Sequence, residues 1–290
     1  MKILGGLFQL VRPLDWSKNS FVLAGLLFSH RWDEAQIFIR TLWVFGAFCM
    51  IASCVYVLND IVDRHRDAHH PTKCHRPIAS GLIQIHWALL FGALLCALSL
   101  IAALEVSVEA FYFVVGYGLM NVAYTFWLKH VAVLDVFVIA TGFVLRILIG
   151  TVGIGIPASG WVILCGLSLA LFLGFCKRKA ELLKLGDAAA KHRAVLGDYS
   201  SEGLNQMIAI CAACVMMSYS LYTLDDKTIE IHGTRWMIMT TPFVLYGIFR
   251  YLHQMYTGSG GGRPARTLSH DPHLVVTVLA WLGTTWFIIG

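Results

Sequence analysis

The feature that most constrains this chain is a series of long apolar segments. A helix crosses the hydrocarbon core of a bilayer with about 20 predominantly apolar residues. None of the segments alternates apolar and polar residues as the strands of a membrane β-barrel do. We therefore expect an all-α, polytopic membrane protein that forms a single domain over residues 1–290. Nine apolar segments of roughly this length lie at 16–30, 37–58, 84–104, 107–127, 131–154, 160–176, 205–224, 235–252 and 273–290.

The charged residues support a membrane protein and also show where its chemistry lies. They make up 13% of the chain, 39 in all, whereas a soluble domain has about 25%. So few charges cannot cover a soluble surface, and the composition excludes disordered, collagen-like and disulfide-framework classes. Residues 59–80 and 177–198 hold 16 of the 39 charges. We expect the functional site in these two stretches.

The basic residues predict how the chain is oriented in the membrane. Cytoplasmic segments of membrane proteins are enriched in Lys and Arg. With the N-terminus in the cytoplasm, the nine spans place 17 basic residues on the cytoplasmic side and four on the opposite side. This distribution predicts a multi-pass protein of the cell inner (plasma) membrane, with both charged stretches on its cytoplasmic face.

The first charged stretch contains four oxygen-bearing side chains in helical register. Asn59, Asp63 and Asp67 are spaced four residues apart, and Asp60 stands three residues before Asp63. Side chains at these spacings share one face of a helix, where like charges repel unless a cation neutralises them. Carboxylate and amide oxygens suit Mg²⁺, so we expect all four as metal ligands and the three aspartates as catalytic residues. The alternative is an ordinary solvated helix end with neighbouring arginines as counter-charges.

Two basic residues follow this acidic face, and a second kind of metal site is also conceivable there. Lys73 and Arg76 are well placed to contact phosphate groups held by the metal. The histidines and the cysteine between positions 69 and 75 are potential zinc ligands, but their spacing matches no standard zinc pattern. We therefore favour magnesium over zinc.

The same stretch resembles the UbiA superfamily of intramembrane prenyltransferases. That superfamily has an NDxxDxxxD signature, followed by an R-P-(I/L)-x-(S/A)-G run. Residues 59–67 and Arg76–Gly81 match both patterns position for position, and the nine-span layout is also similar. The resemblance covers essentially the whole chain and implies a UbiA-type helical bundle with a Mg²⁺-dependent active site that faces the cytoplasm.

The second charged stretch departs from that superfamily. Its prenyltransferases carry a second acidic motif, DxxxD, after the sixth span, which helps to hold a second Mg²⁺. Here Lys177 and Glu181 stand at the two carboxylate positions when the sequences are placed without gaps. A lysine does not bind Mg²⁺ but binds phosphate as a point charge, and Arg178 can bind phosphate with two parallel hydrogen bonds. One metal-binding face and one basic face therefore replace two metal-binding faces.

This substitution resembles the decaprenyl-phosphate phosphoribosyltransferase branch of the superfamily. That branch also has an R-P-x-x-W-x-K-N opening, seen here at Arg12–Asn19, a K-R-x-x-E-L run, seen at Lys177–Leu182, and a similar segment around Tyr199. The resemblance implies a glycosyltransferase that joins phosphoribosyl diphosphate to a polyprenyl phosphate and releases diphosphate. We expect membrane lipid and phosphoribosyl diphosphate as its partners, and no nucleic acid.

Up to three phosphate groups meet in such a reaction, so cations beyond one Mg²⁺ are needed. The acceptor phosphate is already an anion, so substitution at C1 of the ribose needs no general base, and catalysis rests on positioning and electrostatics. Arg146 joins the set because a charge inside a span indicates a functional site, although pairing with a helix carbonyl or a buried acid is an equally good interpretation. The expected substrate-binding residues are Lys18, Asn59, Lys73, Arg76, Lys129, Arg146, Lys177, Arg178, Glu181 and Tyr199.

Two other functions compete with this interpretation. The first is transfer of a prenyl group from its diphosphate to an aromatic acceptor, and the missing second DxxxD motif counts against it. The second is a transporter or channel, which predicts charges at mid-membrane depth in several spans. Only Arg146 lies that deep in this sequence.

Overall fold

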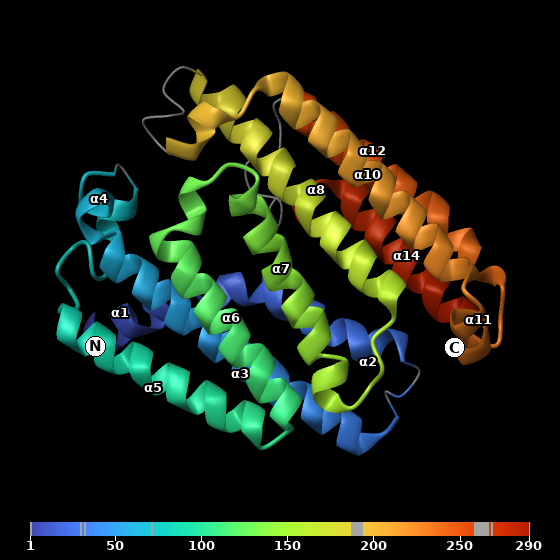
Figure 1. Cartoon of the computed structure of the whole chain (residues 1–290), viewed down its shortest axis with the longest axis horizontal. Helices are drawn as coiled ribbons and strands as arrows, with labels where there is room; N and C mark the ends of the chain where they lie inside the picture. Colours follow the sequence, from blue (N-terminus) through green and yellow to red (C-terminus); the bar gives the residue numbers. More distant parts are fainter. Residues whose placement is uncertain are drawn as a thin grey trace. The chain divides into compact units, whose positions relative to one another are not determined.

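Every regular element in the described part of the chain is helical (Figure 1). The computed structural model describes residues 2–29, 31, 33–70, 72–186, 194–257, 267 and 269–289. Four basic residues that were counted as cytoplasmic, Lys191, Arg193, Arg263 and Arg266, lie outside these ranges. The longer helices are α1 (Lys2–Val11), α3 (Ala35–Val62), α5 (Ile85–Leu104), α6 (Val108–Phe126), α7 (Leu134–Ile149), α8 (Gly160–Leu185), α10 (Ser201–Leu224), α12 (Thr241–Tyr256) and α14 (Pro272–Ile289).

Six of the described helical segments are long and apolar enough to cross a membrane. They are α3, α5, α7 together with the short 3₁₀ helix η4 (Val152–Ile154), α8, α10 and α14. Each lies where the sequence predicts a span, and α6 fills the predicted span 107–127. The prediction of an all-α, multi-pass membrane protein is therefore confirmed.

The N-terminal segment differs from the single α-helix that a span at 16–30 suggests. Residues Pro13–Leu23 form a 3₁₀ helix, η1, and Ala24–Phe28 form the five-residue helix α2. Polar residues between Asp15 and Asn19 lower the mean hydropathy of this segment. At about 2.0 Å per 3₁₀ residue and 1.5 Å per α-helical residue, the two helices together extend about 30 Å. That length matches the hydrocarbon core of a bilayer.

The contacts divide the chain into two compact units. Unit 1 comprises residues 1–128 and 145–158, and unit 2 comprises residues 129–144 and 159–290. The single domain expected over the whole chain stays a prediction.

Unit 1 is built around α3, which packs against α1, α5 and α6 (Figure 1). Its core contains Val44, Phe48 and Ile51 of α3. A buried hydrogen bond of 2.6 Å runs from Ser99 Oγ of α5 to the Ala47 carbonyl of α3. This core fixes the direction of α3, and hence the position of the charged residues at its C-terminal end.

Unit 2 consists mainly of α8, α10, α12 and α14 (Figure 1). Helix α8 packs along α10, and α12 packs along α14. The core includes Phe172 and Phe175 of α8 and Val215 of α10. Arg250 of α12 donates to Asp271 just before α14, at 2.7 Å, and so ties these two helices together. The second charged stretch begins at the C-terminal part of α8, which this core supports.

Candidate active site

The first charged stretch keeps its helical register although α3 ends at Val62. Asp63 separates α3 from α4 (Arg64–Ala68), yet the backbone N–H of Asp63 donates to the Asn59 carbonyl and that of Asp67 to the Asp63 carbonyl, both at 2.9 Å. Asp60 and Asp67 are two helical turns apart and therefore lie on one face, as predicted. Both side chains are buried.

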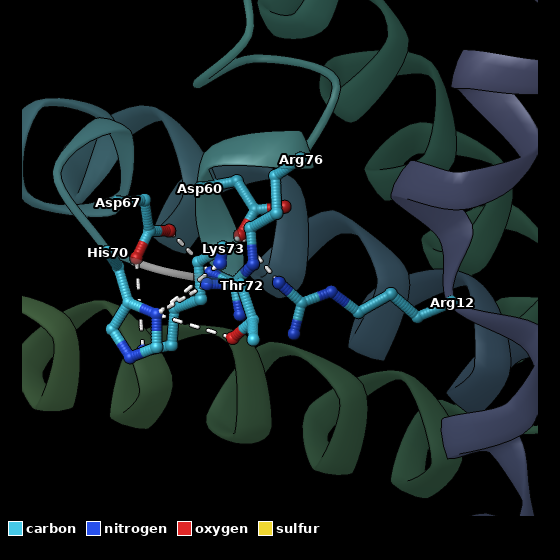
Figure 2. Close-up of polar contacts among 7 residues, drawn as sticks. All are labelled: Arg12, Asp60, Asp67, His70, Thr72, Lys73 and Arg76. Atoms are coloured by element: carbon cyan, nitrogen blue, oxygen red, sulfur yellow. Dashed lines mark hydrogen bonds and ion pairs between the residues drawn. The ribbon is translucent and has the colours of Figure 1, made fainter.

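One guanidinium joins these two aspartates. Arg76 Nη1 lies 3.0 Å from Asp60 Oδ1 and 2.5 Å from Asp67 Oδ2 (Figure 2). A second guanidinium reaches the same Asp60 oxygen, with Arg12 Nη2 at 2.5 Å. Lys73 Nζ stands 3.8 Å from Asp67 Oδ1. Three cations therefore surround two buried carboxylates, and Lys73 and Arg76 lie beside the acidic face as the sequence predicts.

The loop that carries Lys73 is held by a histidine. His70 Nδ1 accepts hydrogen bonds from the backbone N–H groups of Thr72, at 3.2 Å, and of Lys73, at 3.4 Å (Figure 2). The short 3₁₀ helix η2 (Lys73–His75) follows, and the Arg76 N–H donates to the Lys73 carbonyl at 3.0 Å. These bonds direct both basic side chains toward Asp60 and Asp67.

Of the four predicted ligands, Asp60 and Asp67 share the Arg76 guanidinium, whereas Asn59 bonds to α6. Asn59 Oδ1 accepts a hydrogen bond of 2.6 Å from Thr125 Oγ1 of α6, and Asp63 lies at the junction between α3 and α4. Within the described residues, no three His, Cys, Asp or Glu side chains lie close enough together to hold a metal ion. The guanidiniums of Arg12 and Arg76 neutralise the repulsion between Asp60 and Asp67.

Lys18 and Arg146 are tied to η1 in unit 1. Lys18 Nζ pairs with Asp15 at 2.6 Å on the partly exposed side of η1. Arg146 is buried, and its Nε donates to Asn19 Oδ1 at 2.8 Å while Nη2 donates to Tyr117 OH at 3.1 Å. Its guanidinium also stacks on the rings of Phe48 and Tyr117. Arg146 therefore connects η1, α3, α6 and the end of α7.

The second charged stretch separates its two leading basic residues. Lys177 is partly exposed, with Nζ 3.9 Å from Glu181 Oε1. Arg178 is buried, and its Nε lies 2.8 Å from Oδ2 of the fully buried Asp135, while Nη1 lies 2.9 Å from Glu181 Oε2. Lys177 and Glu181 are thus partly exposed in the C-terminal part of α8, whereas the Arg178 guanidinium is held inside unit 2.

Tyr199 belongs to the same network. Its hydroxyl donates to Asp135 Oδ1 at 2.7 Å and accepts from the backbone N–H of Val133 at 2.6 Å. Burial and the hydrogen bond to Asp135 raise the pKa of Tyr199 above its ordinary value, so the phenol stays protonated and donates. Val133 has a φ of 68°, a strained conformation for a β-branched residue. The half-buried Lys129 lies just before it on the 3₁₀ helix η3 (Leu128–His130).

The structure adds two residues that the sequence did not single out as site residues. Arg12 lies 48 positions from Asp60, and Asp135 lies 43 positions from Arg178. Arg12 is the first residue of the R-P-x-x-W-x-K-N motif, and this position could have indicated a role in the site. Asp135 stands in the first turn of the apolar helix α7. An acidic residue at the start of an apolar helix indicates a site residue less specifically than a motif does.

The fold and this cluster define a class, namely a polytopic helical membrane protein with buried aspartates and cations gathered at the end of a spanning helix. The description of the UbiA prenyltransferase family matches residues 19–268, and the chain belongs to that family of transferase enzymes.

Relatives agree with this membership, and solved structures share the fold. The chain is 32% identical to the decaprenyl-phosphate phosphoribosyltransferase of Mycolicibacterium smegmatis, over 97% of this chain and 92% of the relative. It is 34% identical to the enzyme of the same name from Corynebacterium glutamicum, over 96% and 84%. A UbiA homolog from Archaeoglobus fulgidus, solved bound to GPP and Mg²⁺, has the same fold, with a TM-score of 0.72, 18% identity and coverage of 98% and 99%.

Proposed function

We propose that this protein transfers the 5-phosphoribosyl group of phosphoribosyl diphosphate to a polyprenyl phosphate and releases diphosphate. The observation that carries the proposal is the basic second stretch, where Lys177 stands at a position that is acidic in the prenyltransferases of the family. The names of relatives that are 32% and 34% identical support it. The excess of Lys and Arg on one side supports a reaction at the cytoplasmic face.

We assign the first charged stretch to Mg²⁺ and the leaving diphosphate. Asp60 and Asp67 fit a divalent cation because one oxygen of each lies within 3.0 Å of a single Arg76 nitrogen, so one positive centre can reach both. Asn59 and Asp63 complete the predicted ligands. When bound, Mg²⁺ supplies a Lewis acid that polarises the diphosphate. Lys73 and Arg76 bind its remaining oxygens as charge-assisted donors.

We assign the partly exposed cations to the other phosphate groups of the two substrates. Lys18, Lys129 and Lys177 are point charges on short or terminal helical segments, which suits phosphate monoesters. Glu181 orients Lys177 across one turn of α8. Arg146, Arg178 and Tyr199 remain predicted substrate-binding residues, and their observed contacts give them a second task of holding η1 and the start of α7 in place.

The test is a comparison of substrate pairs in membranes that contain the protein. One reaction receives labelled phosphoribosyl diphosphate, Mg²⁺ and polyprenyl phosphates of several lengths. The other receives a prenyl diphosphate and 4-hydroxybenzoate. We expect a labelled lipid from the first pair only. Product from the second pair alone would overturn the proposal in favour of aromatic prenyl transfer.

A further inference from the structure

Arg12 adopts an unusual backbone conformation at the point where the chain turns from α1 into η1. Its φ is 51° and its ψ is 61°, in the left-handed region that L side chains rarely adopt. Pro13 follows directly and disfavours helical conformations of the residue before it. Such strain persists only where surrounding contacts impose it, and it is concentrated at functional sites.

Ser53 of α3 imposes this turn from both sides. The buried Ser53 hydroxyl lies 2.8 Å from the Val11 carbonyl and 2.7 Å from the Cys49 carbonyl, which share its one proton, and it accepts from Trp16 Nε1 at 3.1 Å. Tyr56 and Asp60 follow on the same face of α3, three and seven positions later. The turn therefore delivers the Arg12 side chain along this face and toward Asp60.

The Arg12 guanidinium lies over one residue of this face and bonds to another. Its Cζ stands 4.9 Å from the centre of the Tyr56 ring, and its Nη2 stands 2.5 Å from Asp60 Oδ1. Asp60 is almost fully buried, whereas about a quarter of the Arg12 side chain is exposed, at 24%. A guanidinium has five N–H donors, so Arg12 can bind a further anion without leaving the cluster.

Arg12 and a divalent cation compete for the Asp60 carboxylate. Asp60 Oδ1 already accepts from both Arg12 and Arg76, and a cation bound to that oxygen repels both guanidiniums. A phosphorylated substrate that arrives with the cation offers those guanidiniums new anionic acceptors. The guanidinium charge is therefore balanced in both states. Its partner is Asp60 in the free protein and the phosphate oxygens when cation and substrate are bound.

We propose that Arg12 is a substrate-binding residue that exchanges partners, from Asp60 in the free protein to the diphosphate group of the substrate once a divalent cation occupies Asp60. This deepens the proposed function and rests on it for the identity of the diphosphate substrate. Neither the sequence motif nor the names of the relatives assign this role to Arg12. The exchange predicts opposite effects of one substitution on two ligands.

The experiment measures both ligands separately on purified full-length protein in detergent. Mn²⁺ alone is titrated by electron paramagnetic resonance, and inorganic diphosphate is then titrated at saturating Mn²⁺. In Arg12→Gln, Mn²⁺ should bind about tenfold more tightly because its competitor is gone, and diphosphate about tenfold more weakly because a charged donor is lost. Arg31→Gln, an exposed arginine paired with Glu34, is the matched control and should change neither.

Three results would overturn the exchange: unchanged or weaker Mn²⁺ binding in Arg12→Gln, unchanged diphosphate binding in Arg12→Gln, or the same shifts in Arg31→Gln. If Arg12→Gln fails to fold, Arg12→Lys decides. It keeps the charge but lacks the planar fork, so Mn²⁺ binding should stay unchanged while diphosphate binding weakens about threefold; equal diphosphate binding contradicts the exchange. If both binding shifts occur but the wild type makes no phosphoribosyl product, the proposed function is overturned and the exchange at Arg12 still stands.

Discussion

At the scale of single residues, Asp60 is the side chain on which the proposed chemistry depends most. It is buried at the end of α3 and contacts two guanidiniums. Asp60→Asn keeps the shape of the side chain but removes its charge, so we expect diphosphate release to fall at least about a hundredfold. Release is measured from labelled phosphoribosyl diphosphate, with Glu34→Gln as an exposed carboxylate control. Near-normal turnover in Asp60→Asn would remove this residue from the metal site.

The buried pair Arg178–Asp135 makes a separate prediction about stability. Removal of one partner leaves an uncompensated charge inside unit 2, which typically lowers the free energy of unfolding by roughly 3–5 kcal/mol. Arg178→Met should therefore lower the melting temperature, and adding Asp135→Leu should restore much of it, because an apolar pair tolerates burial. Thermal unfolding of Arg178→Met, Asp135→Leu and the double variant gives the three melting temperatures, and additive losses in the double variant would contradict this prediction.

These residues also show what the sequence can and cannot predict at this scale. The helical spacing predicted that Asp60 and Asp67 share a face, and Arg76 joins them. The pattern of basic residues predicted Arg178 as a phosphate ligand but could not show that Asp135 holds it, since the two lie 43 positions apart. The same limit applies to Arg12, whose partner depends on how η1 folds back onto α3.

At the scale of helices, α2 closely approaches the backbone just after α7 in unit 1. A Cβ atom placed on Gly25 would lie 1.8 Å from the Gly150 carbonyl oxygen. Gly25→Ala should therefore lower the free energy of unfolding by about 1–3 kcal/mol through overpacking. Gly46→Ala, in α3 with open space around it, is the control and should be neutral or slightly stabilising. Equal melting temperatures of the two variants in detergent would contradict this packing.

The positions of the helices follow from the sequence more directly than their conformations. Apolar runs of about 20 residues mark the spans because a lipid environment requires them. The 3₁₀ conformation of η1 was not predicted, since it depends on Pro13 at its start and on the Ser53 contacts of a distant helix. Helix α8 continues to Leu185, nine residues beyond the apolar segment 160–176, because charged residues can extend a helix past the membrane.

At the scale of the whole molecule, the chain is a multi-pass integral membrane protein of the UbiA family. Its charges are few, and the two stretches that hold many of them differ in character. The stretch in unit 1 contains paired carboxylates with cations around them, and the stretch in unit 2 begins with Lys177 and a buried arginine. This difference is the basis for proposing phosphoribosyl transfer over prenyl transfer.

The identity of the lipid product tests this central claim most directly. Purified protein is incubated with polyprenyl phosphate, Mg²⁺ and phosphoribosyl diphosphate labelled with ¹³C in the ribose, and the extracted lipid is analysed by mass spectrometry. We predict a lipid that carries the intact polyprenyl phosphate plus one labelled phosphoribosyl group, with an equal amount of free diphosphate, and none of either with Asp60→Asn. A lipid fraction without labelled ribose, from folded protein with Mg²⁺ present, would contradict the account.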